Sequence, residues 1–126
     1  MNLPAALQPK EQAIVTAILQ LLRYKGIPHT HVRNSGRIVG GGNRPIRFMH
    51  DPLAVKGVAD ILACWKGRAI AIEVKSATGR VRPEQVEWLR EWEKNGGLAM
   101  VARSVGAVEA WLDHMPMTGQ YHALIM

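Results

Sequence analysis

Two short apolar runs, separated by a break of two residues, constrain the fold of this chain more than any other feature. The first run is Ile61–Trp65, the break is Lys66-Gly67, and the second run covers residues 69–72. Two apolar runs joined by two residues that end in Gly are typical of a β-hairpin with a tight turn. The sequence therefore predicts two antiparallel strands whose register is set by this turn.

The predicted register brings two acidic residues together. If Trp65 faces Arg68, counting back along both strands sets Asp60 opposite Glu73. Directly opposed side chains have Cβ atoms about 4.5–5.5 Å apart, and like charges at that distance repel each other. We therefore expect a cation between them, either a divalent metal ion or, less effectively, Lys75, which shares a strand face with Glu73.

Two alternatives to this interpretation stay open at the level of sequence. A loop of odd length or a β-bulge would shift the pairing by one residue and turn Glu73 to the opposite face. A Glu-x-Lys pattern in a strand is also common as a solvated pair on an exposed face. The acidic partner Asp60 and the apolar surroundings favour a functional site over a solvated pair.

Composition and charge bound the class of protein. The chain has 126 residues with 48% hydrophobic content, which predicts a single domain over residues 1–126 and excludes a disordered chain. A formal net charge of +6 favours a polyanionic partner. Cys64 is the sole cysteine, so we expect no disulfide framework and no Cys-based zinc site, and we expect Cys64 to be a small buried residue. The sequence contains no apolar stretch long enough to span a membrane and no signal-peptide pattern at its start, so we expect a cytoplasmic protein without a membrane partner.

Hydrophobic periodicity predicts an α/β domain, with a mixed central sheet flanked by helices. Helical spacing indicates helices over residues 10–25 and 83–95, and a third helix capped by Ser104. Residues 98–102 read as a buried strand, so the unit from residue 69 to 102 is expected to be a right-handed parallel crossover. Residues 27–33 and 44–48 are predicted as short strands around a mobile Gly-rich loop. Trp88 and Trp92 fall near the buried stripe of their helix, which favours core packing over base stacking.

The segment between Gln12 and His50 contains no acidic residue and several arginines. Guanidinium groups along Gly-rich loops suit phosphate contacts, because their planar donors match phosphate oxygens. The alternative is a solvated basic surface. The Gly-rich stretch is not followed by Gly-Lys-Ser/Thr, which excludes a Walker phosphate loop. The histidines of this segment, His29, His31 and His50, are expected to make surface or DNA contacts rather than to bind a metal ion.

An Asp at one strand, Glu-x-Lys on the next strand, and then a helix that begins near a Gln resemble the PD-(D/E)XK nuclease superfamily. Within that superfamily, the sequence is similar to a stand-alone member of the VRR-NUC family. The matching pieces are Glu11, Arg33-Asn34-Ser35-Gly36, Gly57-Val58-Ala59-Asp60, Ile72-Glu73-Val74-Lys75 and Pro83-Glu84-Gln85. Two departures are Ala59, where Pro is frequent, and Arg82, where a Ser or Thr helix cap is usual.

The resemblance implies a PD-(D/E)XK nuclease-like fold and metal-dependent hydrolysis of phosphodiesters. It implies that Mg²⁺ or Mn²⁺ is held by Asp60, Glu73 and the backbone carbonyl of Val74. The implied catalytic residues are Lys75, Gln85 and Glu11. The residues expected to bind nucleic acid are Arg33, Arg37, Arg44, Arg47, Lys56, Arg80 and Arg82.

The function predicted from this resemblance is a structure-selective DNA endonuclease, a Holliday-junction resolvase that acts on branched DNA as a homodimer. The alternatives are a nuclease of other specificity (flap, single-strand or nicking) and a non-catalytic nucleic-acid-binding module with a nuclease fold. An apolar tail would supply the dimer interface, unless it folds back onto its own core. Its residues are Met115, Met117, Leu124, Ile125 and Met126.

Overall fold

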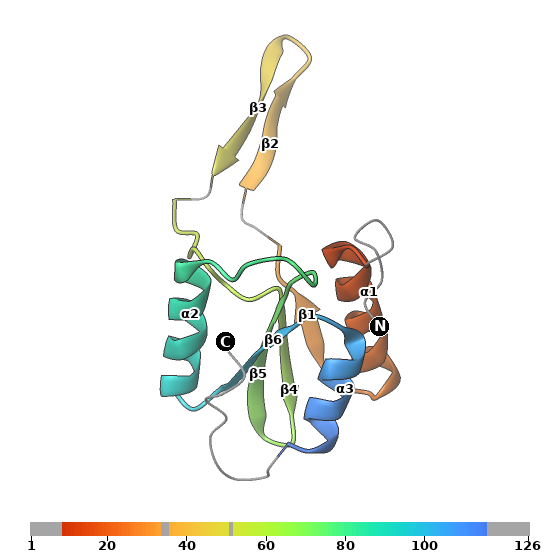
Figure 1. Ribbon diagram of the computed structural model, residues 1–126. Helices are drawn as coiled ribbons and strands as arrows, with labels where there is room; N and C mark the ends of the chain where they lie inside the picture. The colour runs from red at the N-terminus through yellow and green to blue at the C-terminus, as the bar shows by residue number, and fades with distance from the viewer. Residues whose placement is uncertain (1–8, 34–35, 51, 116–126) are drawn as a thin grey trace.

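The structure is a computed structural model that describes residues 9–33, 36–50 and 52–115 (Figure 1). It contains helices and strands in the mixed order that the sequence predicts, with one additional hairpin. The elements in chain order are α1 (Glu11–Tyr24), β1 (His29–His31), β2 (Gly36–Gly41), β3 (Arg44–His50), β4 (Ile61–Trp65), β5 (Arg68–Val74), α2 (Pro83–Lys94), β6 (Leu98–Ala102) and α3 (Val105–Asp113).

The hairpin of β4 and β5 has the predicted register. Trp65 pairs with Arg68 and Ile61 pairs with Ile72, without a bulge between them. The turn residues Lys66 and Gly67 both have positive φ, at 51° and 76°. Positive φ at both central residues defines the type I′ turn, whose twist matches that of the flanking strands. The Lys66-Gly67 break therefore sets the pairing of the two strands.

The central sheet is mixed and has the strand order β1-β4-β5-β6. β1 and β5 pair with β4 in antiparallel fashion, and β6 pairs with β5 in parallel fashion across the connection made by α2. Helices α1 and α3 contact each other on one face of the sheet, and α2 covers the other face (Figure 1). This arrangement confirms the predicted α/β fold, with a mixed central sheet flanked by helices.

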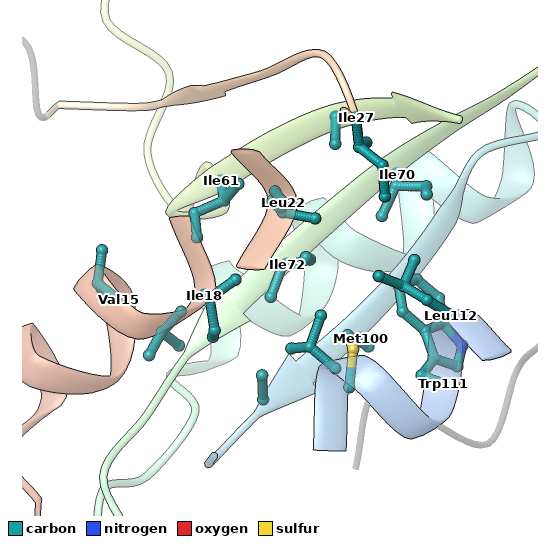
Figure 2. Packing of buried hydrophobic residues seen from close by; sticks show 14 of the residues in the cluster. Val15, Ile18, Leu22, Ile27, Ile61, Ile70, Ile72, Met100, Trp111 and Leu112 are labelled. Carbon is teal, nitrogen blue, oxygen red and sulfur yellow. The ribbon is translucent and has the colours of Figure 1, made fainter. Parts of the chain in front are cut away.

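Alternation along β5 divides the core into two unequal parts. Ile70, Ile72 and Val74 face the larger cluster beneath α1 and α3, together with Ile18 and Leu22 of α1 (Figure 2). The intervening Ala71 faces the smaller cluster beneath α2, which contains Leu89 and the partly buried Trp88 and Trp92. The two tryptophan rings stack on each other with centroids 5.0 Å apart. Both tryptophans pack against the sheet, as the sequence predicts.

The ends of the helices follow from local sequence signals. Glu11 lies in the first turn of α1, where a carboxylate interacts favourably with the helix dipole, and Gly26 follows the helix with a φ of 72°. The Ser104 side chain accepts a hydrogen bond of 3.1 Å from Ala107 N and caps α3. None of the helices in the described part of the chain is long and apolar enough to cross a bilayer.

Three expectations for the described residues were wrong. Gly36–Gly41 is a strand rather than a loop, because it pairs with β3 and accommodates its glycines with a bulge between Val39 and Gly41. The strand expected over residues 27–33 covers only His29–His31. Cys64 is exposed, because alternation along β4 turns its neighbours Ala63 and Trp65 toward the larger cluster and Cys64 away from it.

The burial of the core predicts that two isoleucines contribute very differently to the free energy of unfolding. Ile18 is 0% exposed in the larger cluster, whereas Ile46 of β3 is 73% exposed. Ile18→Ala should lower the free energy of unfolding by about 2–5 kcal/mol, since it leaves a cavity between α1 and the sheet. Ile46→Ala should change it by less than about 0.5 kcal/mol. Urea denaturation of both variants measures the contrast, and equal losses would contradict this description of the core.

Candidate active site

The site forms where β4 begins and β5 ends. Asp60 directly precedes β4 and Glu73 is the penultimate residue of β5, so the pairing of Ile61 with Ile72 brings the two acidic residues to neighbouring positions. Asp60 Oδ2 accepts a hydrogen bond of 2.8 Å from Val74 N. This bond ties the Asp60 carboxylate to the next strand and fixes its direction.

Glu73 is buried with one satisfied and one unsatisfied oxygen. Its side chain is only 2% exposed. Glu73 Oε1 accepts a hydrogen bond of 3.1 Å from Gln85 Nε2, whereas the buried Oε2 meets no donor among the described residues. An unsatisfied buried carboxylate oxygen is costly, because it loses its hydration without gaining a partner. This atom is therefore suited to a proton or to a metal ion.

The pKa of Glu73 is raised from an ordinary value of 4.5 to about 8, mainly by burial and then by the charge of Asp60 and a hydrogen-bonding contact with its carboxyl. Lys75 opposes the increase, and the charge of Glu11 adds to it. Two carboxyl groups can share a hydrogen bond only when one of them is protonated. Without a bound cation, Glu73 therefore holds a proton at neutral pH.

Lys75 lies just beyond the end of β5, with its side chain 8% exposed. Its backbone N–H donates a hydrogen bond of 3.0 Å to Ala102 O at the end of β6, which continues the parallel pairing by one residue. The effect of Lys75 on the pKa of Glu73 indicates that its ammonium group lies close to the acidic pair. A buried cation beside two carboxyl groups can act on an anionic substrate that approaches them.

Gln85 links the acidic pair to the start of α2. Its Oε1 accepts a hydrogen bond of 2.9 Å from Arg82 N, while its Nε2 donates to Glu73. The first bond satisfies a free N–H at the helix start, as in half of a capping box, although Arg82 itself makes no side-chain cap. The same amide therefore stabilises the helix and orients Glu73. Gln85 thus partly compensates for the absence of a Ser or Thr cap at Arg82.

Gly57 allows the segment before Asp60 to pack against the first turn of α2. Its φ is 81°, and a Cβ atom at this position would overlap the backbone carbonyl of Glu84. Only Gly combines this backbone conformation with so close an approach. Gly57 and Gln85 thus both contribute to the junction between the first turn of α2 and the acidic pair.

Arg103 is a residue of the site region that sequence reasoning missed. It follows β6, and its guanidinium donates hydrogen bonds of 2.7 Å to Ser76 O and to Gly79 O. These bonds fix the loop that joins Lys75 to α2. The signal was available in the topology, because the carboxyl ends of the parallel strands β5 and β6 meet at one edge of the sheet.

The structure brings together Asp60, Glu73, Lys75 and Gln85, with Glu11 near enough to affect the pKa of Glu73. The described ranges contain no group of three or more His, Cys, Asp or Glu side chains that could hold a metal ion. Arg37 lies on β2 opposite Met49, but its side chain is outside the described part of the structure. The remaining residues expected to bind nucleic acid are exposed: Arg33, Arg44, Arg47, Lys56, Arg80 and Arg82.

The histidines of the basic segment show no metal-binding arrangement in the described structure. His29 and His31 lie on β1, at the edge of the central sheet. His29 Nδ1 makes a hydrogen bond of 2.8 Å with Ile27 O, so this nitrogen donates within the chain. His50 ends β3, and its side chain is outside the part described.

The acidic pair, the lysine beyond it and the helix that holds them lie in one continuous segment. Residues 55–106 match the VRR-NUC domain family. This match confirms the resemblance predicted from the sequence, and it covers Asp60, Glu73, Lys75 and Gln85. A VRR-NUC domain indicates a nuclease-type function with DNA as substrate, and PD-(D/E)XK-like nuclease domains generally use divalent metals. Comparison with curated proteins gave no match.

The raised pKa of Glu73 predicts how stability depends on pH in the absence of metal. Between pH 4.5 and about 8, folded Glu73 holds a proton that the unfolded chain has released. This group therefore contributes stability at low pH, and the contribution is lost as pH rises through that window, by at most about 1.4 kcal/mol per pH unit.

Glu73→Gln should remove this contribution to the pH dependence. Urea denaturation in EDTA should show that the variant becomes increasingly more stable than the wild type as pH rises toward 8. Glu109→Gln, which changes an exposed residue of α3, is the matched control and should follow the wild type. Parallel curves for Glu73→Gln and the wild type would mean that Glu73 is not protonated in the folded protein.

Proposed function

We propose that this chain is a metal-dependent, structure-selective DNA endonuclease whose single domain covers residues 1–126. The observation that carries the proposal is the buried Glu73 Oε2, which has no donor among the described residues and lies beside the Asp60 carboxyl. In a carboxylate pair with only a structural role, an unsatisfied buried oxygen would lower stability without compensation. A pair that receives a cation during function has its cost offset when the cation binds.

The donor set fits a hard divalent cation. Asp60, Glu73 and the backbone carbonyl of Val74 would hold Mg²⁺ or Mn²⁺, since these ions prefer carboxylate and carbonyl oxygens and complete their shell with water and phosphate. Glu11 would contribute directly or through a water molecule. When bound, the metal ion lowers the pKa of water and stabilises negative charge on the phosphate under attack.

The other residues of the site have separate roles in this proposal. Lys75 positions the attacking water or neutralises charge that develops on the phosphate, which is the task of a preorganised cation in a partly buried site. Gln85 keeps Glu73 Oε1 in place through its amide and leaves Oε2 for the cation. In this role Gln85 acts on the metal ligand rather than on the water alone.

Exposed cations around the site would hold the substrate. Arg80 and Arg82 lie on the loop between Lys75 and α2, which Arg103 fixes through two backbone carbonyls. Arg33 and Lys56 lie on the segments that precede and follow the β2–β3 hairpin. Both segments lead to Asp60, because Val32 N donates a hydrogen bond of 2.7 Å to Asp60 O. Cations at these places would contact phosphates on both sides of the scissile bond.

We further propose that the substrate is a four-way junction and that the enzyme acts as a homodimer. One metal site makes one cut, so two symmetric nicks require two copies related by a two-fold axis. Met115 packs against the larger core cluster, which fits a tail that begins by folding back on its own domain. Met117, Leu124, Ile125 and Met126 lie outside the described residues. The alternatives are a nuclease for flaps, single strands or nicks, and a non-catalytic binding module.

Loss of either acidic residue should abolish cleavage while DNA binding persists. Asp60→Asn or Glu73→Gln should lower the rate by roughly a thousandfold or more, because a bound metal ion contributes several kcal/mol to the transition state. Gel analysis of a labelled DNA panel with Mg²⁺ or Mn²⁺ measures the rate, with Glu109→Gln as the control. Lys75→Ala should also lose turnover, yet it should still bind Mn²⁺ in a calorimetric titration. Cleavage at the wild-type rate by either acidic variant would falsify the assigned site.

Assembly and substrate can be tested together. A homodimer should have a mass in solution of about twice 13.9 kDa, and it should nick a four-way junction at symmetry-related positions. A comparison panel of single strand, duplex and flap measures the preference. A monomer that cuts flaps or single strands and ignores junctions would exclude the resolvase and leave the nuclease. Binding without cleavage of any substrate would favour the non-catalytic module.

A further inference from the structure

The β2–β3 hairpin stands away from the rest of the molecule as a two-stranded arm (Figure 1). Among the helices and strands of the described residues, β2 and β3 contact only each other. An isolated two-stranded hairpin is marginally stable in water, because it buries little apolar surface. Because the arm projects from the domain despite this low stability, we expect a partner to cover its surface.

The arm exposes apolar and cationic side chains together. Ile46 is 73% exposed and Phe48 is 57% exposed, and alternation along β3 places both on one face of the arm. Arg47 and Met49 alternate with them on the opposite face, and Met49 is 42% exposed. The arm thus has an apolar stripe accompanied by positive charge.

Charge identifies the kind of partner. The sequence has no acidic residue between Gln12 and His50, so every charged side chain on the arm is positive at neutral pH. A second copy of this arm would repel the first, and the chain as a whole has a net charge of +6. A polyanion complements this surface. The major groove of duplex DNA is about 12 Å wide, which admits a two-stranded β-ribbon, and it presents apolar thymine methyl groups between walls of phosphate.

The root of the arm lies at the candidate active site. The chain leaves the central sheet after Val32 and returns to it at Asp60, where Val32 N donates a hydrogen bond of 2.7 Å to Asp60 O. Asp60, which directly precedes β4 and faces Glu73, therefore lies at the point where the chain returns from the arm to the central sheet. DNA bound by the arm would therefore lie at the edge of the sheet that carries the acidic pair.

We propose that the β2–β3 arm inserts into the major groove of duplex DNA beside the scissile phosphate, with Ile46 and Phe48 against base edges and Arg44 and Arg47 against the phosphate walls. The inference rests on the proposed nuclease function and deepens it. It specifies that the substrate carries a double-stranded segment next to the cut. In this arrangement the apolar stripe is covered by DNA during function.

The test separates the apolar contacts from the charged ones. Fluorescence anisotropy in EDTA, where no cleavage occurs, gives the Kd for a short labelled duplex and for one of its strands. The apolar variant combines Ile46→Thr with Phe48→Thr, since Thr retains a preference for strands. The charge variant combines Arg44→Ala with Arg47→Ala. Tyr24→Ser is the matched control, because Tyr24 is 89% exposed at the end of α1 opposite to Glu11.

The apolar variant should bind duplex roughly tenfold more weakly, comparable to the loss of one base contact, and its salt dependence should not change. The charge variant should flatten the slope of log K against log salt by about one to two units, because each phosphate contact contributes about −0.9. Tyr24→Ser should bind like the wild type. Methylation of guanine N7, which lies in the major groove, should interfere with binding, whereas methylation of adenine N3 in the minor groove should not.

Several outcomes would overturn the inference. If the apolar variant bound duplex with wild-type affinity, Ile46 and Phe48 would not contact the groove. An equal loss of affinity for single strand and duplex would indicate stacking on unpaired bases. A change of the apolar variant from dimer to monomer before DNA is added would assign the stripe to a second copy. None of these results depends on cleavage, so they are distinct from failure of the nuclease proposal, which the Asp60→Asn assay tests.

Discussion

The unfavourable proximity of Asp60 and Glu73 is the constraint on which the rest of the site depends. Glu73 is buried beside the partly buried Asp60, and burial together with the charge of Asp60 raises the pKa of Glu73 to about 8. The surrounding contacts prevent the pair from relaxing. Val74 N holds one oxygen of Asp60, and Gln85 holds one oxygen of Glu73.

Helix α2 and strand β6 hold the acidic pair in position. α2 covers the sheet through Leu89 and the stacked tryptophans, and its first turn meets Gly57 closely enough to exclude any side chain there. Trp92 Nε1 donates a hydrogen bond of 3.3 Å to Ala69 O at the other end of β5. The packing of α2 thus links the acidic pair, near one end of β5, to the hairpin turn at the other end of β5. Stability and site geometry depend on the same contacts.

Local patterns in the sequence predicted the central sheet because its determinants are themselves local. Lys66-Gly67 imposes a turn geometry, and the apolar runs beside it have only one register that buries them. The same reasoning failed at Gly36–Gly41, where the glycines favoured a loop but pairing with β3 prevailed. Cys64 and Arg103 could not be assigned from neighbouring residues. Their positions depend on which strand face is covered and on where β5 and β6 end.

The hydrogen bond between Val32 and Asp60 has a consequence for how such a protein can change over evolution. It closes the excursion between β1 and β4 at its base, so the central sheet does not depend on the β2–β3 hairpin, which contacts no other helix or strand of the described residues. The entropic cost of closing a loop rises by only about 0.6 kcal/mol for each doubling of its length. The β2–β3 part of this segment can therefore lengthen, shorten or be exchanged between related proteins, while Gly57 and Asp60 stay in place.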